Sequence, residues 1–275
     1  MREIMYSQSS LLIVAALLLC MVLSIEFGYR IRGARRKQAA ANEAIQQASA
    51  VLVSMLGLLA LLLAFTFSAS LQRYDDRSRS VVAEANAIGT AYLRAELVPG
   101  DIAGASAQDL VRQYLDVRIR EGRVDFNDAA ERNLLLATAR TLEARLWGHA
   151  VAAARLDPGP VTSGLFIQSL NDLIDASAAR RAANSRHVPE VVIFLVFATI
   201  LVTTATLGYA SGLAGHRVTL AAFVLVVLIA LVVYLIIDLD RPRRGSIQVS
   251  QDSLVNLQQV IGQAQLPANP AGATN

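Results

Sequence analysis

The sequence predicts an all-α integral membrane protein with four transmembrane helices and an extramembrane helical bundle inserted between the second and the third. Three observations support this fold class. Four segments are apolar over about 20 residues, the length of helix that spans a bilayer. The 275 residues are 54% hydrophobic and only 17% charged, below the ~25% that is usual in soluble proteins. The polar segment between the second and third apolar segments has helical periodicity and turn residues.

The predicted spans are 11–29, 48–71, 191–209 and 218–238. Glu26 shortens the apolar core of the first span. The alternative is a soluble protein with four buried helices. Soluble core helices keep a polar face, however, and the fourth segment has almost none.

The first apolar segment is predicted to remain as a helix, although a cleaved signal peptide is the alternative. Its start is not clearly basic, because Glu3 follows Arg2, and no small-residue cleavage site precedes the basic cluster after it. The single cysteine, Cys20, lies inside this segment. An intramolecular disulfide and a cysteine-based metal site are therefore excluded, and we expect Cys20 to pack or to face lipid.

The first helix of the insert is predicted to continue directly out of the second span. Apolar residues recur along one of its faces as far as the Pro99-Gly100 pair, which ends it. This stripe consists of Val81, Ala85, Ile88 and Tyr92. Three more amphipathic helices are expected at 106–121, from Asn127 or Asp128 to before Pro158, and from Thr162 to Arg186. Helices joined by such short turns form a bundle.

The chain is therefore predicted to have four parts. Residues 1–71 hold two spans and a basic loop, 72–188 the helical bundle, 189–238 the last two spans, and 239–275 a membrane-flanking segment and disordered tail. Only the segment from Ser246 to Val249 has a strand-like pattern.

Lysine and arginine residues in short loops decide the predicted orientation. Five basic residues within 30–37 place that loop in the cytoplasm, and the amino terminus and helical insert outside a bacterial cytoplasmic membrane. Six arginines at the other ends of the spans favour the opposite orientation: Arg73, Arg77, Arg79, Arg241, Arg243 and Arg244. The net charge of +3 arises at these membrane flanks, so the lipid bilayer, not nucleic acid, is the expected partner.

The sequence gives no indication of an enzyme, a cofactor or a metal site. The histidines at positions 149, 187 and 216 lie far apart, and none has a ligand partner at helical spacing. Carboxylates of the insert stand among arginines, as Glu131 with Arg132 and Glu143 with Arg145, which is typical of a solvated helix face. A glycine-rich phosphate loop and a nucleophile elbow are both missing.

Hydroxyl side chains are the main polar groups within the predicted spans. In the second span they alternate with aromatic residues and give four pore-lining candidates: Phe65, Thr66, Phe67 and Ser70. One interpretation is hydrogen bonding and close packing between helices. The other is a weakly polar pore wall with an aromatic constriction. The spans lack acids and bases at mid-membrane, which argues against an ion-coupled transporter and suits an anion path.

Two further groups of residues stand out near the membrane surface. The first is a helix-packing motif for a neighbouring helix or subunit, made of Glu84, Asn86, Gly89 and Thr90. The second follows from the end of the fourth span, where carboxylates oppose the helix dipole unless they are paired. We predict a membrane-surface ion-pair network there, and arginines bound to lipid phosphates are the alternative. Its members are Arg73, Asp75, Arg77, Asp238, Asp240, Arg241 and Arg244.

The runs RYDDRSRSVVAEANAIGTAYLRA and LDRPRRGSIQVSQ resemble the bacterial bestrophin-like domain family of membrane proteins. The second run contains an Asp-Arg-Pro-x-Arg-Gly signature followed by Val-Ser. Its matching residues are Asp240, Arg241, Pro242, Arg244, Gly245, Val249 and Ser250. The resemblance covers nearly the whole chain and implies two spans, a helical insert and two more spans.

A more distant resemblance links the end of the second span to bestrophins, which are pentameric anion channels. Bestrophins have an Arg-aromatic-aromatic-Glu-x-Arg element there, and Arg73, Tyr74, Asp75 and Arg77 are similar at a spacing that differs by one residue. The acidic run that clasps calcium in animal bestrophins is missing. In bestrophins the region after the second helix is cytosolic, opposite to the charge-based orientation.

Two functions therefore remain open. The resemblance implies a homo-oligomeric channel, with an anion as its ligand and the second span lining the pore. The alternative is a non-conducting membrane anchor, sensor or scaffold whose insert binds a partner.

Overall fold

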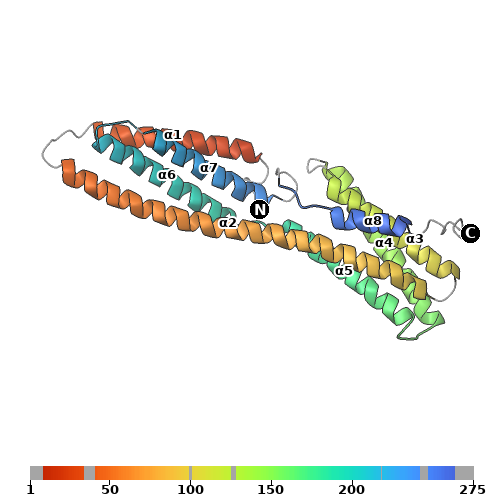
Figure 1. Ribbon diagram of the computed structural model, residues 1–275. Coiled ribbons are helices and arrows are strands. Elements are labelled where there is room, and N and C mark those ends of the chain that lie inside the picture. Colours follow the sequence, from red (N-terminus) through yellow and green to blue (C-terminus); the bar gives the residue numbers. More distant parts are fainter. Residues whose placement is uncertain are drawn as a thin grey trace, which may run out of the picture. The chain divides into compact units, whose positions relative to one another are not determined.

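The computed structural model describes residues 9–33, 41–98, 101–124, 128–217, 219–241 and 247–263. Within these ranges the chain is helical and contains no strand, and residues 247–249 of the strand-like segment have no regular structure. The helices are α1 Ser10–Gly33, α2 Ala41–Arg94, the 3-10 helix η3 Ala95–Leu97, α3 Asp101–Arg123, α4 Ala129–Leu156, α5 Ser163–Ser185, α6 Glu190–Leu213, α7 Leu220–Asp240 and α8 Asp252–Gln263 (Figure 1).

Four stretches of helix are long and apolar enough to cross a membrane. They are 10–31, 43–97, 163–213 and 220–240; the first three contain the predicted spans, and the fourth begins two residues later than the predicted 218–238. The predicted fold class is thereby confirmed. The predicted continuation of the second span into the insert is also confirmed, because α2 is one helix of 54 residues.

The chain divides into two compact units. The first unit, residues 1–74 and 187–248, contains α1, the first part of α2, α6 and α7. The second unit, residues 75–186 and 249–275, contains the rest of α2 with α3, α4, α5 and α8.

In the first unit, α1 and α6 pack with their backbones in contact. A Cβ atom added at Gly28 would lie 2.0 Å from the carbonyl oxygen of Ala205, and one at Gly208 would lie 2.0 Å from that of Ile25. The Ser24 hydroxyl donates across the same contact to the carbonyl of Leu201 at 2.8 Å. Glycine and serine at a helix contact are typical of membrane helices, which lack a hydrophobic drive to associate.

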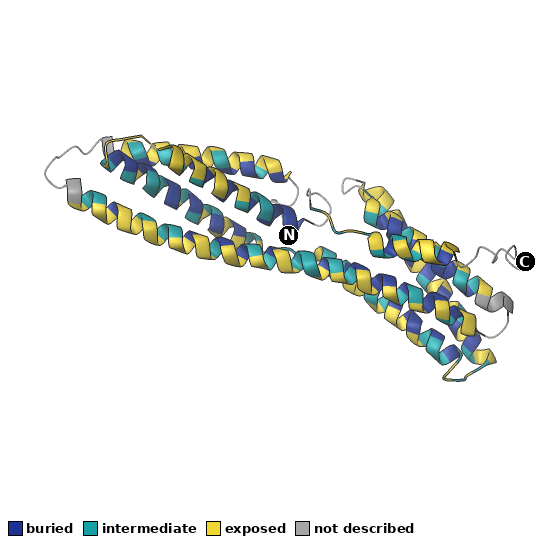
Figure 2. Cartoon of the chain, in the orientation of Figure 1, coloured by how far each residue is buried: buried dark blue, intermediate teal, exposed yellow. Residues whose placement is uncertain are grey.

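Each helix of the first unit has both buried and exposed residues (Figure 2). Its core includes Leu17, Met21, Leu59, Ile200 and Val233. Large apolar residues on every span are nevertheless exposed, such as Leu19, Phe65, Phe194 and Leu231. A surface of this kind fits surroundings of lipid tails, as the apolar composition of the spans predicts.

The second unit has a core formed by one face of each of its helices, including Ile88, Tyr114, Leu146, Phe166 and Leu173. Asp128, one of the two predicted caps, begins α4 by accepting a hydrogen bond from the backbone N–H of Glu131 at 2.9 Å. Asp157 holds the turn before α5, because its carboxylate accepts from Thr162 Oγ1 at 2.5 Å and from the Gly159 N–H at 2.9 Å. These two bonds lower the pKa of Asp157.

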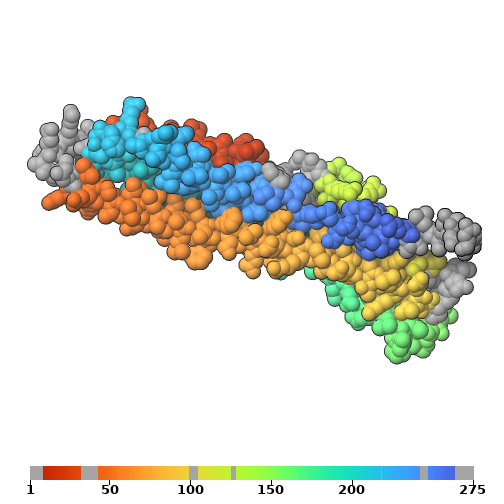
Figure 3. All heavy atoms as spheres, viewed as in Figure 1, coloured from red at the N-terminus to blue at the C-terminus, as the bar shows by residue number. Residues whose placement is uncertain are grey.

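Helix α8 lies in the part of the chain predicted as a membrane-flanking segment and tail. Leu254, Leu257 and Ile261 recur at helical spacing, and Leu254 and Ile261 are buried in the core of the second unit. Figure 3 shows this segment lying along the second unit's part of α2. Its helical pattern is only 12 residues long, which makes it easy to miss in a polar tail. Residues 267–275, predicted as disordered, are outside the described ranges.

Candidate functional site

The four pore-lining candidates on α2 divide between two faces of the helix. Thr66 and Ser70 lie one turn apart and are buried inside the first unit, with 5% and 0% of their surface exposed. Phe65 is 66% exposed, and Phe67 is half-buried against the core. Successive residues of a helix point about 100° apart, so Phe65 and Thr66 cannot line the same surface. Of the four, Phe65 lies on the open face.

The two buried hydroxyls differ in their hydrogen bonding. Thr66 Oγ1 donates to the carbonyl of Leu62, one turn back on the same helix, at 2.7 Å. Ser70 Oγ has no hydrogen-bond partner within the described ranges. These contacts agree better with helix packing than with a pore wall for this face of α2.

The open face of α2 carries a regular stripe of exposed residues. The stripe consists of Val51, Ser54, Leu58, Leu61, Phe65 and Ser68. Their spacing alternates between three and four residues, which keeps them along one side of the helix and is the spacing found in helices that associate along a seam. Val53, Gly57, Ala60 and Ala64 beside them are also exposed. The apolar stretch of α2 is also the least buried of the four candidate spans. This stripe is called the α2 seam below.

At the end of α7, the first unit contains two buried carboxylates, each with 1% of its surface exposed. Asp240 Oδ2 accepts from the backbone N–H of Val188 at 2.9 Å, and Asp238 Oδ2 accepts from that of Ile247 at 3.0 Å. His187 Nδ1 lies 3.2 Å from the carbonyl oxygen of Asp240. These contacts join the start of α6 and residue 247 to the end of α7.

Arg241 connects the same helix end to the amino-terminal helix. Its guanidinium is buried and donates from Nη1 to Ser10 Oγ at 3.2 Å. The start of α1, the start of α6 and the end of α7 therefore meet at one end of the first unit. This arrangement is expected because consecutive spans run in opposite directions: the first and third spans then start on the side where the fourth span ends.

The other members of the predicted ion-pair network make different contacts. Arg73 Nη1 donates to the carbonyl of Ala69 at 3.3 Å. Arg77 belongs to the second unit, where it donates to the carbonyls of Ala183 and Arg186 at the end of α5. Asp75 is half-buried, and Arg244 lies outside the described residues. Two arginines and two aspartates of the predicted network therefore bind backbone groups.

The predicted helix-packing motif leads to a buried ionic cluster in the second unit. The Glu84 carboxylate is completely buried and accepts from Arg118 Nε at 2.6 Å and from Arg180 Nη1 at 2.5 Å. Arg118 also pairs with Glu121. Burial by itself lowers the pKa of Arg118, because it disfavours the charged form. The adjacent carboxylate of Glu84 acts in the opposite direction, and the pKa of Arg118 is raised above its ordinary value. We call these four side chains, two acids and two bases, the Glu84 cluster.

Segments distant in the sequence complete this cluster. Arg180 Nη2 donates to the side-chain oxygen of Gln251, just before α8, at 2.7 Å. Gly89 lies under α8, where an added Cβ would be 3.1 Å from a methyl carbon of Leu257. Asn86 and Thr90, the other motif residues, are exposed. The sequence contains no signal that pairs Glu84 with Arg118 and Arg180, which are 34 and 96 positions away.

The sequence prediction that Glu143 lies on a solvated helix face is wrong. Glu143 does not belong to a solvated face, because its side chain is only 12% exposed and accepts from Tyr114 Oη at 3.0 Å and Ser177 Oγ at 3.2 Å. Burial raises the pKa of Tyr114, which therefore stays protonated and donates. Glu143 faces inward because it lies four residues after the core residue Ala139 and three before the core residue Leu146, on the same face of α4. In the described part of the chain, no group of three or more His, Cys, Asp or Glu side chains is arranged to hold a metal ion.

This fold defines a class: α-helical, multi-pass membrane proteins with a helical bundle between the second and third spans. The Bestrophin-like domain family matches residues 14–254 of the chain. The chain therefore belongs to the Bestrophin-like family. Comparison with curated proteins gives no match.

Solved structures of a bacterial bestrophin homologue from Klebsiella pneumoniae share the fold. A tryptophan-to-alanine variant has a TM-score of 0.67 at 13% identity, covering 93% of this chain and 98% of that one. A tyrosine-to-alanine variant has 0.64 at 15%, covering 91% and 98%. A structure obtained by Zn-SAD phasing has 0.60 at 13%, covering 91% and 96%.

Proposed function

We propose that the chain is one subunit of an oligomeric anion channel and that the α2 seam lines the conduction path. The observation that carries the proposal is the exposed face of α2, whose apolar stretch is the least buried of the four candidate spans. Helices with such a seam associate with one another, and a ring of them encloses an axis. Membership of the Bestrophin-like family supports the proposal.

The seam has side chains that suit control of an anion path. Leu58, Leu61 and Phe65 would form an apolar constriction, which limits conduction by excluding water. Ser54 and Ser68 are exposed on the same face; Ser54 Oγ donates to the carbonyl of Ala50 at 3.0 Å, and Ser68 can provide a hydroxyl donor. The seam contains no carboxylate, and Arg73 follows it with a positive charge near the end of the span.

The test is chloride efflux from liposomes containing the purified full-length protein. We expect flux from the native protein and a severalfold higher flux after Phe65→Ala, because the constriction widens. Phe194→Ala is the matched control, since Phe194 is 53% exposed on α6 and is expected to face lipid. Phe67→Ala should have a smaller effect than Phe65→Ala.

Two outcomes would contradict the channel proposal. No flux at any voltage or pH would favour the non-conducting anchor, sensor or scaffold. A monomer or simple dimer by light scattering in detergent would remove the axis that the path requires.

Membrane orientation follows from labelling of single cysteines. We retain the charge-based prediction that the amino terminus and the insert lie outside the bacterial cytoplasmic membrane. In a Cys20→Ser background, Gly148→Cys on α4 should then react with an impermeant maleimide in intact cells. Position 148 has no atom near an added Cβ, so the cysteine is tolerated. His216→Cys, in the loop after α6, should react only after permeabilisation. The reverse pattern would support the cytosolic insert that the bestrophin resemblance implies.

A further inference from the structure

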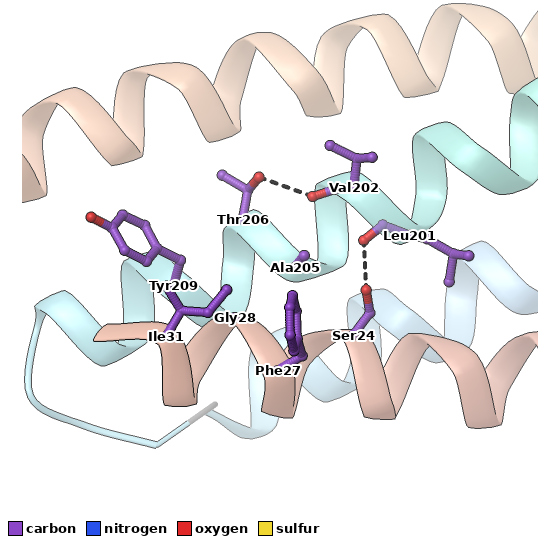
Figure 4. A pocket seen from close by; sticks show the side chains of 9 residues that line it. All are labelled: Ser24, Phe27, Gly28, Ile31, Leu201, Val202, Ala205, Thr206 and Tyr209. Atoms are coloured by element: carbon purple, nitrogen blue, oxygen red, sulfur yellow. Dashed lines mark hydrogen bonds between the residues drawn. The ribbon is translucent and has the colours of Figure 1, made fainter. Parts of the chain in front are cut away.

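We propose that a groove between α1 and α6 binds one acyl chain of an anionic phospholipid. The groove has a volume of about 360 Å³, within the range of about 300–1,000 Å³ that is usual for small-molecule sites. Phe27 and Ile31 of α1 and Val202, Thr206 and Tyr209 of α6 line it (Figure 4). Both helices belong to candidate spans, so we expect the groove to open towards lipid.

The groove follows from the close contact of the two helices. Gly28 lies where α1 meets the backbone of Ala205. Large side chains on either side of this contact project from different helices, so a space remains between them. Phe27, 64% exposed, and Val202, 52% exposed, stand on opposite sides of the hollow and leave it open.

The wall of the groove suits a hydrocarbon chain. Its two small hydroxyls are already satisfied, because Ser24 donates to Leu201 O at 2.8 Å and Thr206 to Val202 O at 2.9 Å (Figure 4). The groove therefore offers an acyl chain a mostly carbon surface. A water molecule there would find few hydrogen-bond partners, and water in a protein site needs two to four.

The end of the groove that lies near the ends of α1 and α6 suits an anionic headgroup. Ile31 and Tyr209 line this end, close to the ends of α1 and α6. The Tyr209 hydroxyl points away from the other lining side chains (Figure 4) and has no hydrogen-bond partner within the described ranges, so it can donate to a phosphate. Arg30 and Arg217 are exposed near these helix ends, although Glu26 pairs with Arg30 at 2.6 Å. Basic sites between membrane helices bind anionic headgroups.

The test is native mass spectrometry of the full-length protein exchanged into detergent with either phosphatidylglycerol or phosphatidylcholine. We expect the native protein to retain one more phosphatidylglycerol than phosphatidylcholine per chain. Val202→Trp should lose that lipid, because the indole fills the groove from its exposed side. Leu195→Trp is the matched control, since Leu195 is exposed on α6 outside the groove. Arg217→Gln should weaken the preference for phosphatidylglycerol while chain binding remains.

The proposal has three ways to fail. Equal lipid retention by Val202→Trp and Leu195→Trp would exclude the groove as the site. Equal retention of the two lipids by the native protein would exclude selection of an anionic headgroup. A change of oligomer mass in Val202→Trp without lipid loss would show that a second copy of the chain fills the groove. None of these outcomes depends on ion conduction, so the channel proposal is tested separately.

Discussion

Glu84→Gln is expected to destabilise the protein by about 3–5 kcal/mol, the usual cost of breaking a buried ion pair by removing one partner. The glutamine keeps the shape of the side chain but removes the charge shared by Arg118 and Arg180. Those guanidiniums stay buried, with 1% and 2% of their surface exposed. Thermal unfolding of the full-length protein in detergent measures the effect, and limited proteolysis of the insert gives a second readout.

The control for this variant is Glu96→Gln. Glu96 is exposed on η3, near the end of α2, and its substitution should change the unfolding free energy by no more than about 0.5 kcal/mol. Combining Glu84→Gln with Arg180→Gln should cost less than the sum of the two single variants, with a coupling of about 0.5–3 kcal/mol. A Glu84→Gln protein as stable as the Glu96→Gln control would contradict the role assigned to the Glu84 cluster.

Gly28→Ala and Gly208→Ala are expected to have the largest effect on the first unit. Each new methyl group would lie 2.0 Å from a backbone oxygen of the opposite helix. Backbone cannot move aside as a flexible side chain can, so α1 and α6 must separate. Overpacking typically costs about 1–3 kcal/mol and occasionally more, and we expect both variants at or above the upper end. Thermal unfolding and the yield of monodisperse protein in detergent measure the loss.

Gly57→Ala is the matched control for these two glycines. Gly57 lies in the apolar stretch of α2, and nothing in the structure is within 4 Å of the added Cβ. Alanine favours helix by about 1 kcal/mol over glycine, so this variant should be as stable as the native protein or slightly more stable. Native-like stability of Gly28→Ala would show that α1 and α6 can separate at this contact without cost.

Burial within the second unit was only partly predictable from the sequence. Periodicity correctly placed Val81, Ala85 and Ile88 on the buried face of α2. The same reasoning placed Glu143 with Arg145 on a solvated face, yet Glu143 bonds Tyr114 inside the bundle. Charge alone does not tell whether a carboxylate faces water or a buried donor, because that depends on which helices pack against it.

The pore candidates show a similar limit. The sequence predicts a pore wall from Phe65, Thr66, Phe67 and Ser70 because these residues are aromatic or polar within an apolar span. The packing of the first unit then separated Phe65 from the buried Thr66 and Ser70. In a span that is apolar on all sides, the sequence has no polar face to show which side is covered.

The sequence by itself determined the four spans, the insert between them and the continuous second helix. These features follow from local physics: a lipid core demands about 20 consecutive apolar residues in a helix, and turn residues end helices where they occur. Only the tertiary structure decided the Glu84 cluster, the glycine contact of α1 with α6, the docking of α8 and the open face of α2. Each of these depends on residues distant in the chain meeting in space, where close contact and the pairing of buried charges select the partners.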